Sequence, residues 1–122
     1  GADLAYMGTR FIATNEANAI EEYKKMIIDS NADDIIYTSL FTGIHGSYLK
    51  GSITRSGLDP EKLENGDKNT MDFSKKESRT KAWKDIWGAG QGVGTMKDIK
   101  SVATLVNEIE EDYSITKKRV CR

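Results

Sequence analysis

The spacing of hydrophobic and polar positions predicts two kinds of element in the first third of the chain. Residues 4–7 form a short apolar run that ends at Gly8, which is typical of a strand. Beyond Asn18 the period becomes helical, and one face of the expected helix carries Ile20, Tyr23, Ile27 and Ile28. Asn18 and Glu21 have the spacing of a capping box, so we expect this helix to begin there.

The middle of the chain has weaker patterns. Residues 35–38 are apolar and rich in β-formers, which predicts a short strand or extended segment. Glycines interrupt "LFTGIHGSYLKGS" before Leu49, and residues 53–56 are expected to add one or two helical turns that stop at Gly57. Residues 58–80 hold the only proline and many charges, so we expect a surface excursion and not a linker between domains.

The C-terminal third combines a glycine-rich loop with a clear helix. Residues 82–87 are expected to form a short helix, and "GAGQGVG" at 88–94 a loop. Ser101 is expected to cap a final helix whose apolar stripe consists of Val102, Leu105, Val106, Ile109 and Tyr113. The basic end "TKKRVCR" is expected to fray. This α/β pattern has too little sheet for a doubly wound fold and too much loop for a helical bundle.

Composition and charge narrow the classes of function. The chain has 122 residues, of which 38% are hydrophobic and 30% charged, a balance typical of a soluble globular domain. Its formal net charge of −1 gives no electrostatic case for binding nucleic acid or an anionic membrane. A single cysteine, Cys121, excludes an internal disulfide and fits a reducing, cytoplasmic origin. One histidine and one cysteine leave little for a metal site, so no metal is expected.

Gly8 and Thr9 are the first candidates for ligand binding. A glycine at the end of a strand lets a ligand approach the backbone closely, and consecutive amides beyond it can bind an anion. Thr9 adds a hydroxyl donor and Arg10 a positive charge. A tight turn between a strand and a helix explains the same residues, and on the residues alone the turn is favoured.

The "GAGQGVG" loop is the second candidate. It does not match the dinucleotide fingerprint, because Val93 stands where the third glycine would be, and no Gly-Lys-Ser/Thr follows it. Its amides and Gln91 could meet a polar ligand, although a plain connecting loop is favoured on the residues alone. His45, in "TGIHGS", has no Ser/Asp partners at a spacing that suggests a triad, so we expect it to be solvent-facing or structural.

Three motifs in order resemble the C-terminal part of the nitronate monooxygenase family, also known as the 2-nitropropane dioxygenase family: "GADLAYMGTRFIAT", "YTSLFTGIHGSYLK" and "WGAGQGVG". The resemblance runs from Gly1 to about Tyr113, and residues 59–80 contribute nothing to it. Members of the family are FMN-dependent (β/α)8 barrels with an added domain on the substrate side. They oxidise alkyl nitronates with O2 to a carbonyl compound and nitrite. The resemblance therefore implies an α/β fold: the C-terminal fragment of an FMN-binding (β/α)8 TIM barrel with added C-terminal helices.

The same resemblance sets the expected domain organisation. A barrel of this kind needs about 250 residues, so residues 1–122 are expected to be the C-terminal part of one domain and not a complete independent domain. Residues 1–3 would be the turn into the last barrel strand. The N-terminal remainder of the barrel is then an expected partner, beside the nitronate and O2, and the chain alone is expected to be inactive.

The resemblance also assigns site residues. The FMN phosphate is expected to be held through backbone amides and a hydroxyl by Met7, Gly8 and Thr9, which reverses the preference for a plain turn. The family's "AGQ" motif corresponds to Ala89, Gly90 and Gln91. These residues are expected to lie near the flavin side of the barrel. The family's catalytic histidine lies in an upstream His-Gly motif, so no catalytic residue is expected in this chain, and His45 is not one.

Two other functions stay open at this point. An FMN-dependent enoyl-acyl carrier protein reductase shares the barrel and similar glycine motifs, and differs upstream and in its use of NAD(P)H. A non-catalytic binding or oligomerisation module is the other possibility, because the two amphipathic helices could mediate assembly.

Overall fold

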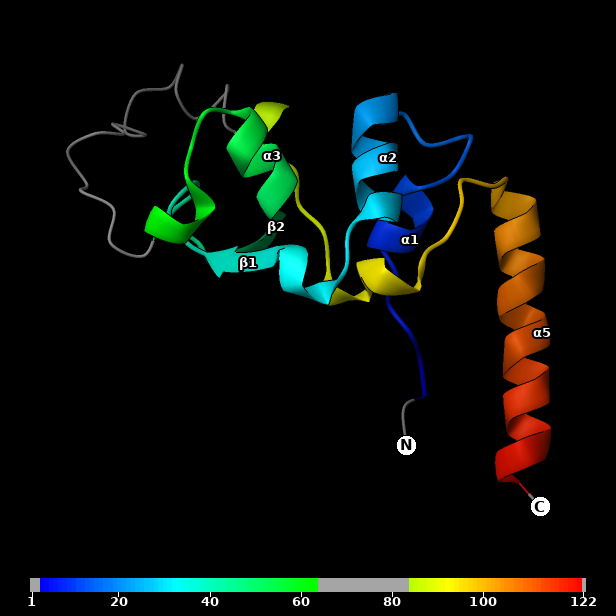
Figure 1. Ribbon diagram of the computed structural model, residues 1–122. Helices are drawn as coiled ribbons and strands as arrows, with labels where there is room; N and C mark the ends of the chain where they lie inside the picture. Colours follow the sequence, from blue (N-terminus) through cyan, green and yellow to red (C-terminus); the bar gives the residue numbers. More distant parts are fainter. Residues whose placement is uncertain (1–2, 64–83, 122) are drawn as a thin grey trace.

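The computed structural model describes residues 3–63 and 84–121. Most elements pack together into one body, here termed the packed part, which contains the helix α2 (Glu21–Asp29), the strands β1 (Ile35–Thr38) and β2 (Gly46–Leu49), and the helix α3 (Lys50–Arg55). Residues 3–7 and the helix α5 (Val102–Val120) project from the packed part toward the same side, where both termini lie (Figure 1).

β1 and β2 form a two-stranded antiparallel sheet in which Ile36 is opposite Tyr48. The prediction of a strand at residues 35–38 is confirmed. β2 was not predicted, because its apolar run is very short and follows a stretch broken by glycine. The loop before it turns at Gly43, whose φ of +79° favours glycine. On its other edge, β2 receives residues 87–89, since Tyr48 also forms an antiparallel bridge with Gly88.

α2 follows the predicted apolar face but not the predicted start. Its N-cap is Ile20, which makes no side-chain capping bond, so the capping box expected at Asn18 is wrong. Asn18 stands two residues ahead of the N-cap, outside the position from which a side chain caps the first turn. A capping box does occur at Asn31, whose side chain accepts a hydrogen bond from Asp33 N–H at 2.8 Å, ahead of the 3-10 helix η1 (Ala32–Asp34).

The remaining short elements agree with the expected pattern in part. α3 begins earlier than the helical turns expected at 53–56 and ends close to Gly57, whose φ is +89°. The 3-10 helix η2 (Pro60–Lys62) opens the expected surface excursion, and most of that excursion lies outside the described residues. Of the helix expected at 82–87, residues 84 and 85 are helical, 86 and 87 are not, and the first two lie outside the described residues.

The core consists of two adjoining hydrophobic clusters. The larger one joins α2, β2 and the glycine-rich segment, and its buried members are Ala13, Ile27, Leu49, Trp87, Ala89, Val93 and Met96. The smaller one lies between the sheet and α3, and its buried members are Phe41, Tyr48, Ile53 and Ile86. Both clusters draw on residues 86–96, so the 3-10 helix η3 (Gln91–Thr95) and the segment before it are fixed by the core.

Residues 4–7 run out from the packed part without regular secondary structure and do not form the predicted strand (Figure 1). A strand requires a neighbour that supplies N–H and C=O groups along its edge. Within the part of the chain that the structure describes, no segment pairs with residues 4–7. Leu4 and Tyr6 are accordingly exposed, at 92% and 103% of the reference area.

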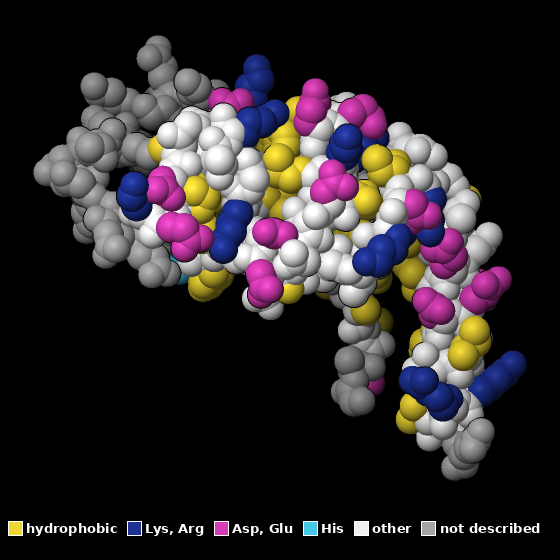
Figure 2. Space-filling model, in the orientation of Figure 1, with side chains coloured by type: hydrophobic (Ala, Val, Ile, Leu, Met, Phe, Trp, Pro, Cys, Tyr) yellow, Lys and Arg dark blue, Asp and Glu magenta, His cyan; other side chains and the backbone are white. Residues whose placement is uncertain are grey.

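α5 begins as predicted and runs further than predicted. The Ser101 hydroxyl accepts a hydrogen bond from Thr104 N–H at 3.1 Å, which confirms the expected cap. The helix continues to Val120, so the expected fraying of the basic end is wrong. Of the predicted apolar stripe, Leu105 is buried while Tyr113 is exposed, and Figure 2 shows hydrophobic side chains along α5 among charged ones. None of the helices in residues 3–63 and 84–121 has the length and apolarity to cross a membrane.

Candidate functional site

The two glycine motifs that the sequence singled out meet in space. The Gly90 N–H donates a hydrogen bond to Thr9 Oγ1 at 2.8 Å, although the two residues are 81 positions apart in the chain. Thr9 is the first residue of the short helix α1 (Thr9–Ile12), and Gly90 immediately precedes η3. The site is therefore the junction at which the projecting N-terminal segment enters the packed part.

The N-terminal half of the site is open. Gly8 precedes α1 as its N-cap, with φ −105°, a conformation that does not require glycine. A Cβ built on Gly8 would meet no heavy atom within 4 Å. Within the described residues, the amides of Gly8 and Thr9 donate no hydrogen bond. Met7 is exposed and makes no polar contact in this part of the chain.

The C-terminal half of the site is firmly held. Ala89 is buried, its side chain lies in the larger core cluster, and its N–H donates to the Ser47 carbonyl at 3.1 Å. Gly90 and Gln91 are exposed beside it. Of the three predicted residues of this motif, Gly90 contacts the N-terminal half directly, Gln91 lies next to it, and Ala89 serves the core.

Two side chains that sequence reasoning missed fix the backbone ahead of Gly90. The Tyr23 hydroxyl donates to the Gly88 carbonyl, and the Trp87 N–H donates to the buried Ser52 Oγ at 2.9 Å. Tyr23 also stacks on Trp87, with ring centroids 4.9 Å apart. The periodicity placed Tyr23 on the apolar face of its helix, and nothing in its spacing indicated a partner 65 residues away.

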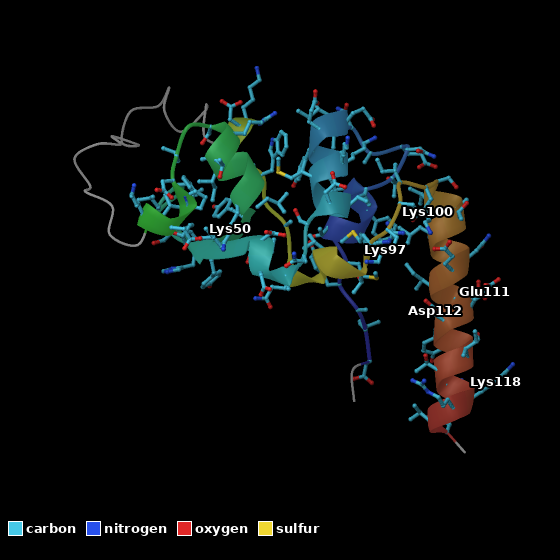
Figure 3. The ribbon with its side chains drawn as sticks, in the orientation of Figure 1. Lys50, Lys97, Lys100, Glu111, Asp112 and Lys118 are labelled. Atoms are coloured by element: carbon cyan, nitrogen blue, oxygen red, sulfur yellow. The ribbon has the colours of Figure 1, made fainter. Side chains whose placement is uncertain are left out.

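The positive charge of Arg10 is not free to help the open amides bind an anion. Its guanidinium forms an ion pair with Asp98 at 3.7 Å. Lys100 joins the same network, with Nζ 3.0 Å from Asp98 and 2.7 Å from Glu108. The carboxylates of Glu108 and Asp98 accept hydrogen bonds from Lys100 and so raise the pKa of its ammonium group. Figure 3 shows Lys97 and Lys100 where the packed part leads into α5, and the ion pair of Lys100 with Glu108 ties this segment to that helix.

His45 lies away from this junction. It is exposed, as predicted, in the loop before β2, and its ring lies 5.1 Å from that of Tyr37. Among the described residues, no group of three or more histidine, cysteine, aspartate or glutamate side chains could hold a metal ion.

Comparison with known proteins identifies the family to which the chain belongs. The family model described as nitronate monooxygenase matches residues 1–112. A curated relative, the "Probable nitronate monooxygenase" of Bacillus subtilis (strain 168), is 27% identical over 128 residues that cover 94% of this chain and 35% of the relative. The chain thus spans about a third of that relative's length.

A solved structure of a FabK mutant from Thermotoga maritima superposes with a TM-score of 0.64 at 22% identity, over 93% of this chain and 35% of that one. At this identity the likeness concerns the fold alone, and it supports the interpretation of the chain as an α/β segment of a larger enzyme fold.

Proposed function

The chain belongs to the nitronate monooxygenase family, and from this premise we propose that the full-length protein is an FMN-dependent enzyme that oxidises alkyl nitronates with O2 to a carbonyl compound and nitrite. Because the chain spans only 35% of the curated relative, the reaction is proposed for the whole protein. This chain would supply part of the FMN phosphate site.

The observation that carries the proposal is the hydrogen bond from Gly90 N–H to Thr9 Oγ1. A threonine hydroxyl has one proton and two lone pairs. Because Gly90 occupies a lone pair, the Thr9 hydroxyl keeps its proton free to donate to an anion. The unengaged amides of Gly8 and Thr9 lie at the same point of the chain, and such a group of donors suits a phosphate.

The proposed roles follow from this arrangement. The phosphate would be held by Gly8 and Thr9, with Met7 leading into the site. The exposed Gly90 and Gln91 would face the flavin side, while Ala89 anchors them to the core. FMN, when bound, supplies the redox chemistry between the nitronate and O2. The base that acts on the substrate would come from the remainder of the barrel, as would most contacts to the flavin ring.

The test of the function is a reaction assay on the full-length protein loaded with FMN. We expect an alkyl nitronate to reduce the flavin under anaerobic conditions, and nitrite to be released once O2 is admitted. A full-length protein that binds FMN but neither oxidises nitronates nor releases nitrite would contradict the proposal.

An FMN-dependent enoyl-acyl carrier protein reductase is the second candidate, and the fold likeness to the FabK structure, with a TM-score of 0.64, keeps it beside the first. The same preparation separates the two. Rapid bleaching of the flavin by NADH, without any response to nitronates, would favour the reductase.

A further inference from the structure

The segment that carries Gly90 is anchored along its length. The Trp87 N–H donates to Ser52 Oγ at 2.9 Å, and Ser52 is fully buried. The Ala89 N–H donates to the Ser47 carbonyl at 3.1 Å. These two bonds come from α3 and β2, and neither of them involves the Gly88 carbonyl.

Tyr23 of α2 supplies that third anchor, because its hydroxyl donates to the Gly88 carbonyl. Its ring is oriented by the stack on Trp87, over whose face the Arg55 guanidinium also lies at 3.9 Å from the ring centroid. Burial raises the pKa of Tyr23 above its ordinary value. The hydroxyl therefore stays protonated, and stays a donor, throughout the neutral range.

The anchor at Gly88 matters because Ala89 has a glycine on either side, and glycine peptides rotate easily. Glycine has more backbone freedom than any other residue, so the Gly88 and Gly90 peptides are the points at which this segment can pivot. The Gly90 N–H occupies one lone pair of Thr9 Oγ1, which leaves the proton of that hydroxyl free to donate to a ligand. The hydrogen bond from the Tyr23 hydroxyl to the Gly88 carbonyl limits rotation of this peptide, because the bonds from β2 and α3 are made to Ala89 and Trp87.

We infer that Tyr23 is a positioning residue of the proposed phosphate site: through Gly88 it fixes the Gly90 amide, and through that amide the Thr9 hydroxyl. Tyr23 acts without touching the phosphate. This inference rests on the proposed function, since it concerns how tightly the protein holds the phosphate of FMN.

The experiment compares FMN with riboflavin, which has the same ring system and no phosphate. Dissociation constants of both are measured by flavin fluorescence on the full-length apoprotein, for the wild type and for Tyr23→Phe, which keeps the stacked ring and removes the hydroxyl. Losing one net hydrogen bond predicts that FMN binds about threefold to tenfold more weakly. Riboflavin binding should not change.

Tyr37→Phe is the matched control, because it removes the hydroxyl of a tyrosine that is 69% exposed in β1. It should leave both constants unchanged. Hydrogen exchange of the peptide covering residues 88–91 adds a readout that needs no ligand: it should quicken in Tyr23→Phe and not in Tyr37→Phe.

Each outcome decides the matter. A selective loss of FMN affinity with faster exchange supports the inference. An equal loss for FMN and riboflavin, or no loss for either, overturns it. Should Tyr23→Phe not fold, Ser52→Ala releases the neighbouring anchor at Trp87 and is judged by the same selectivity. If the wild type itself binds FMN no better than riboflavin, the phosphate site fails, and this result does not depend on any variant.

Discussion

Residues 4–7 and β1 are both short and apolar, yet their environments differ. β1 pairs with β2, and Ile35 and Ile36 pack against the core clusters. Residues 4–7 pair with nothing among the described residues, and Leu4 and Tyr6 are exposed. The difference is therefore in the available neighbours and not in the hydrophobic character of the two segments.

α5 also has one end that packs against the rest of the chain and one end that is exposed. Its first turn buries Leu105 and is fastened by Glu16, whose carboxylate accepts from Val102 N–H at 3.0 Å. Residues 110–120 are all exposed, Tyr113 and Val120 among them. These apolar side chains are separated by charged ones, so the exposed end of α5 does not by itself mark an interaction site. Under the proposed function, the remainder of the full-length protein would cover residues 3–7, which lie within the range 1–112 that the family model matches.

The candidate site lies between the two regions. Gly90 belongs to the packed part and is held by the core, whereas Gly8 continues the bare N-terminal segment. Thr9 is the residue that joins them. Under the proposed function, this chain would build one side of a phosphate site, and the remainder of the full-length protein would build the other.

The largest expected effect is on the isolated 122-residue chain. Its bare extended segment and uncovered helix face should make it self-associate, because unpaired edges and apolar surfaces bind one another. Light scattering after size exclusion and repeated thermal melts measure this. A monomer with a reversible two-state melt would show that the contrast between the two regions does not matter for folding, and would favour an independent binding module.

Leu4→Asp in the full-length protein probes the contrast at a single side chain. If the barrel covers residues 4–7, the substitution buries an unpaired charge and should lower the free energy of unfolding by about 3 kcal/mol or more. Ile44→Asp is the matched control, since Ile44 is 77% exposed in the packed part, and its change should stay within about 0.5 kcal/mol. Chemical denaturation measures both. Equal, small changes would mean that residues 4–7 remain bare in the whole protein.

Thr9→Val tests the residue that joins the two regions. It removes a hydroxyl that can donate to a charged phosphate, a bond worth about 1.5–3 kcal/mol, so FMN should bind roughly tenfold to a hundredfold more weakly. It also deprives the Gly90 N–H of its acceptor. Thr9→Ser keeps the hydroxyl and should bind FMN within about threefold of the wild type. If Thr9→Val and the wild type bound FMN with equal affinity, the Thr9 hydroxyl would not contact the phosphate.

Local features of the fold could be predicted from the sequence, because their causes are local. The strand at Ile35–Thr38 and the cap at Ser101 depend on neighbouring residues and were found. The capping box expected at Asn18 did not form, because α2 begins after Ile20, and the start of a helix also depends on where its packing begins. Residues 4–7 have the composition of a strand, and composition does not say whether a partner is present.

The candidate site could be predicted only in part. The family resemblance singled out Thr9 and Gly90 separately, and their contact spans 81 positions, which no local pattern reports. The periodicity placed Tyr23 on the apolar face of its helix, and its ring does pack against the core. Nothing in the sequence indicated that its hydroxyl also donates to the Gly88 carbonyl. A side chain with two roles shows only the periodic one in a sequence.

Whether the junction of Gly8, Thr9 and Gly90 holds the phosphate of FMN can be decided with Gly8→Val in the full-length protein. The backbone at φ −105° accepts valine, and a Cβ at this position meets no described heavy atom within 4 Å, so the chain itself gives no reason for glycine there. Added bulk against phosphate oxygens should cost about 1–3 kcal/mol, which weakens FMN binding roughly fivefold to a hundredfold. We expect this loss while riboflavin affinity and the melting temperature of the apoprotein stay unchanged. FMN affinity equal to that of the wild type would show that no phosphate lies against Gly8.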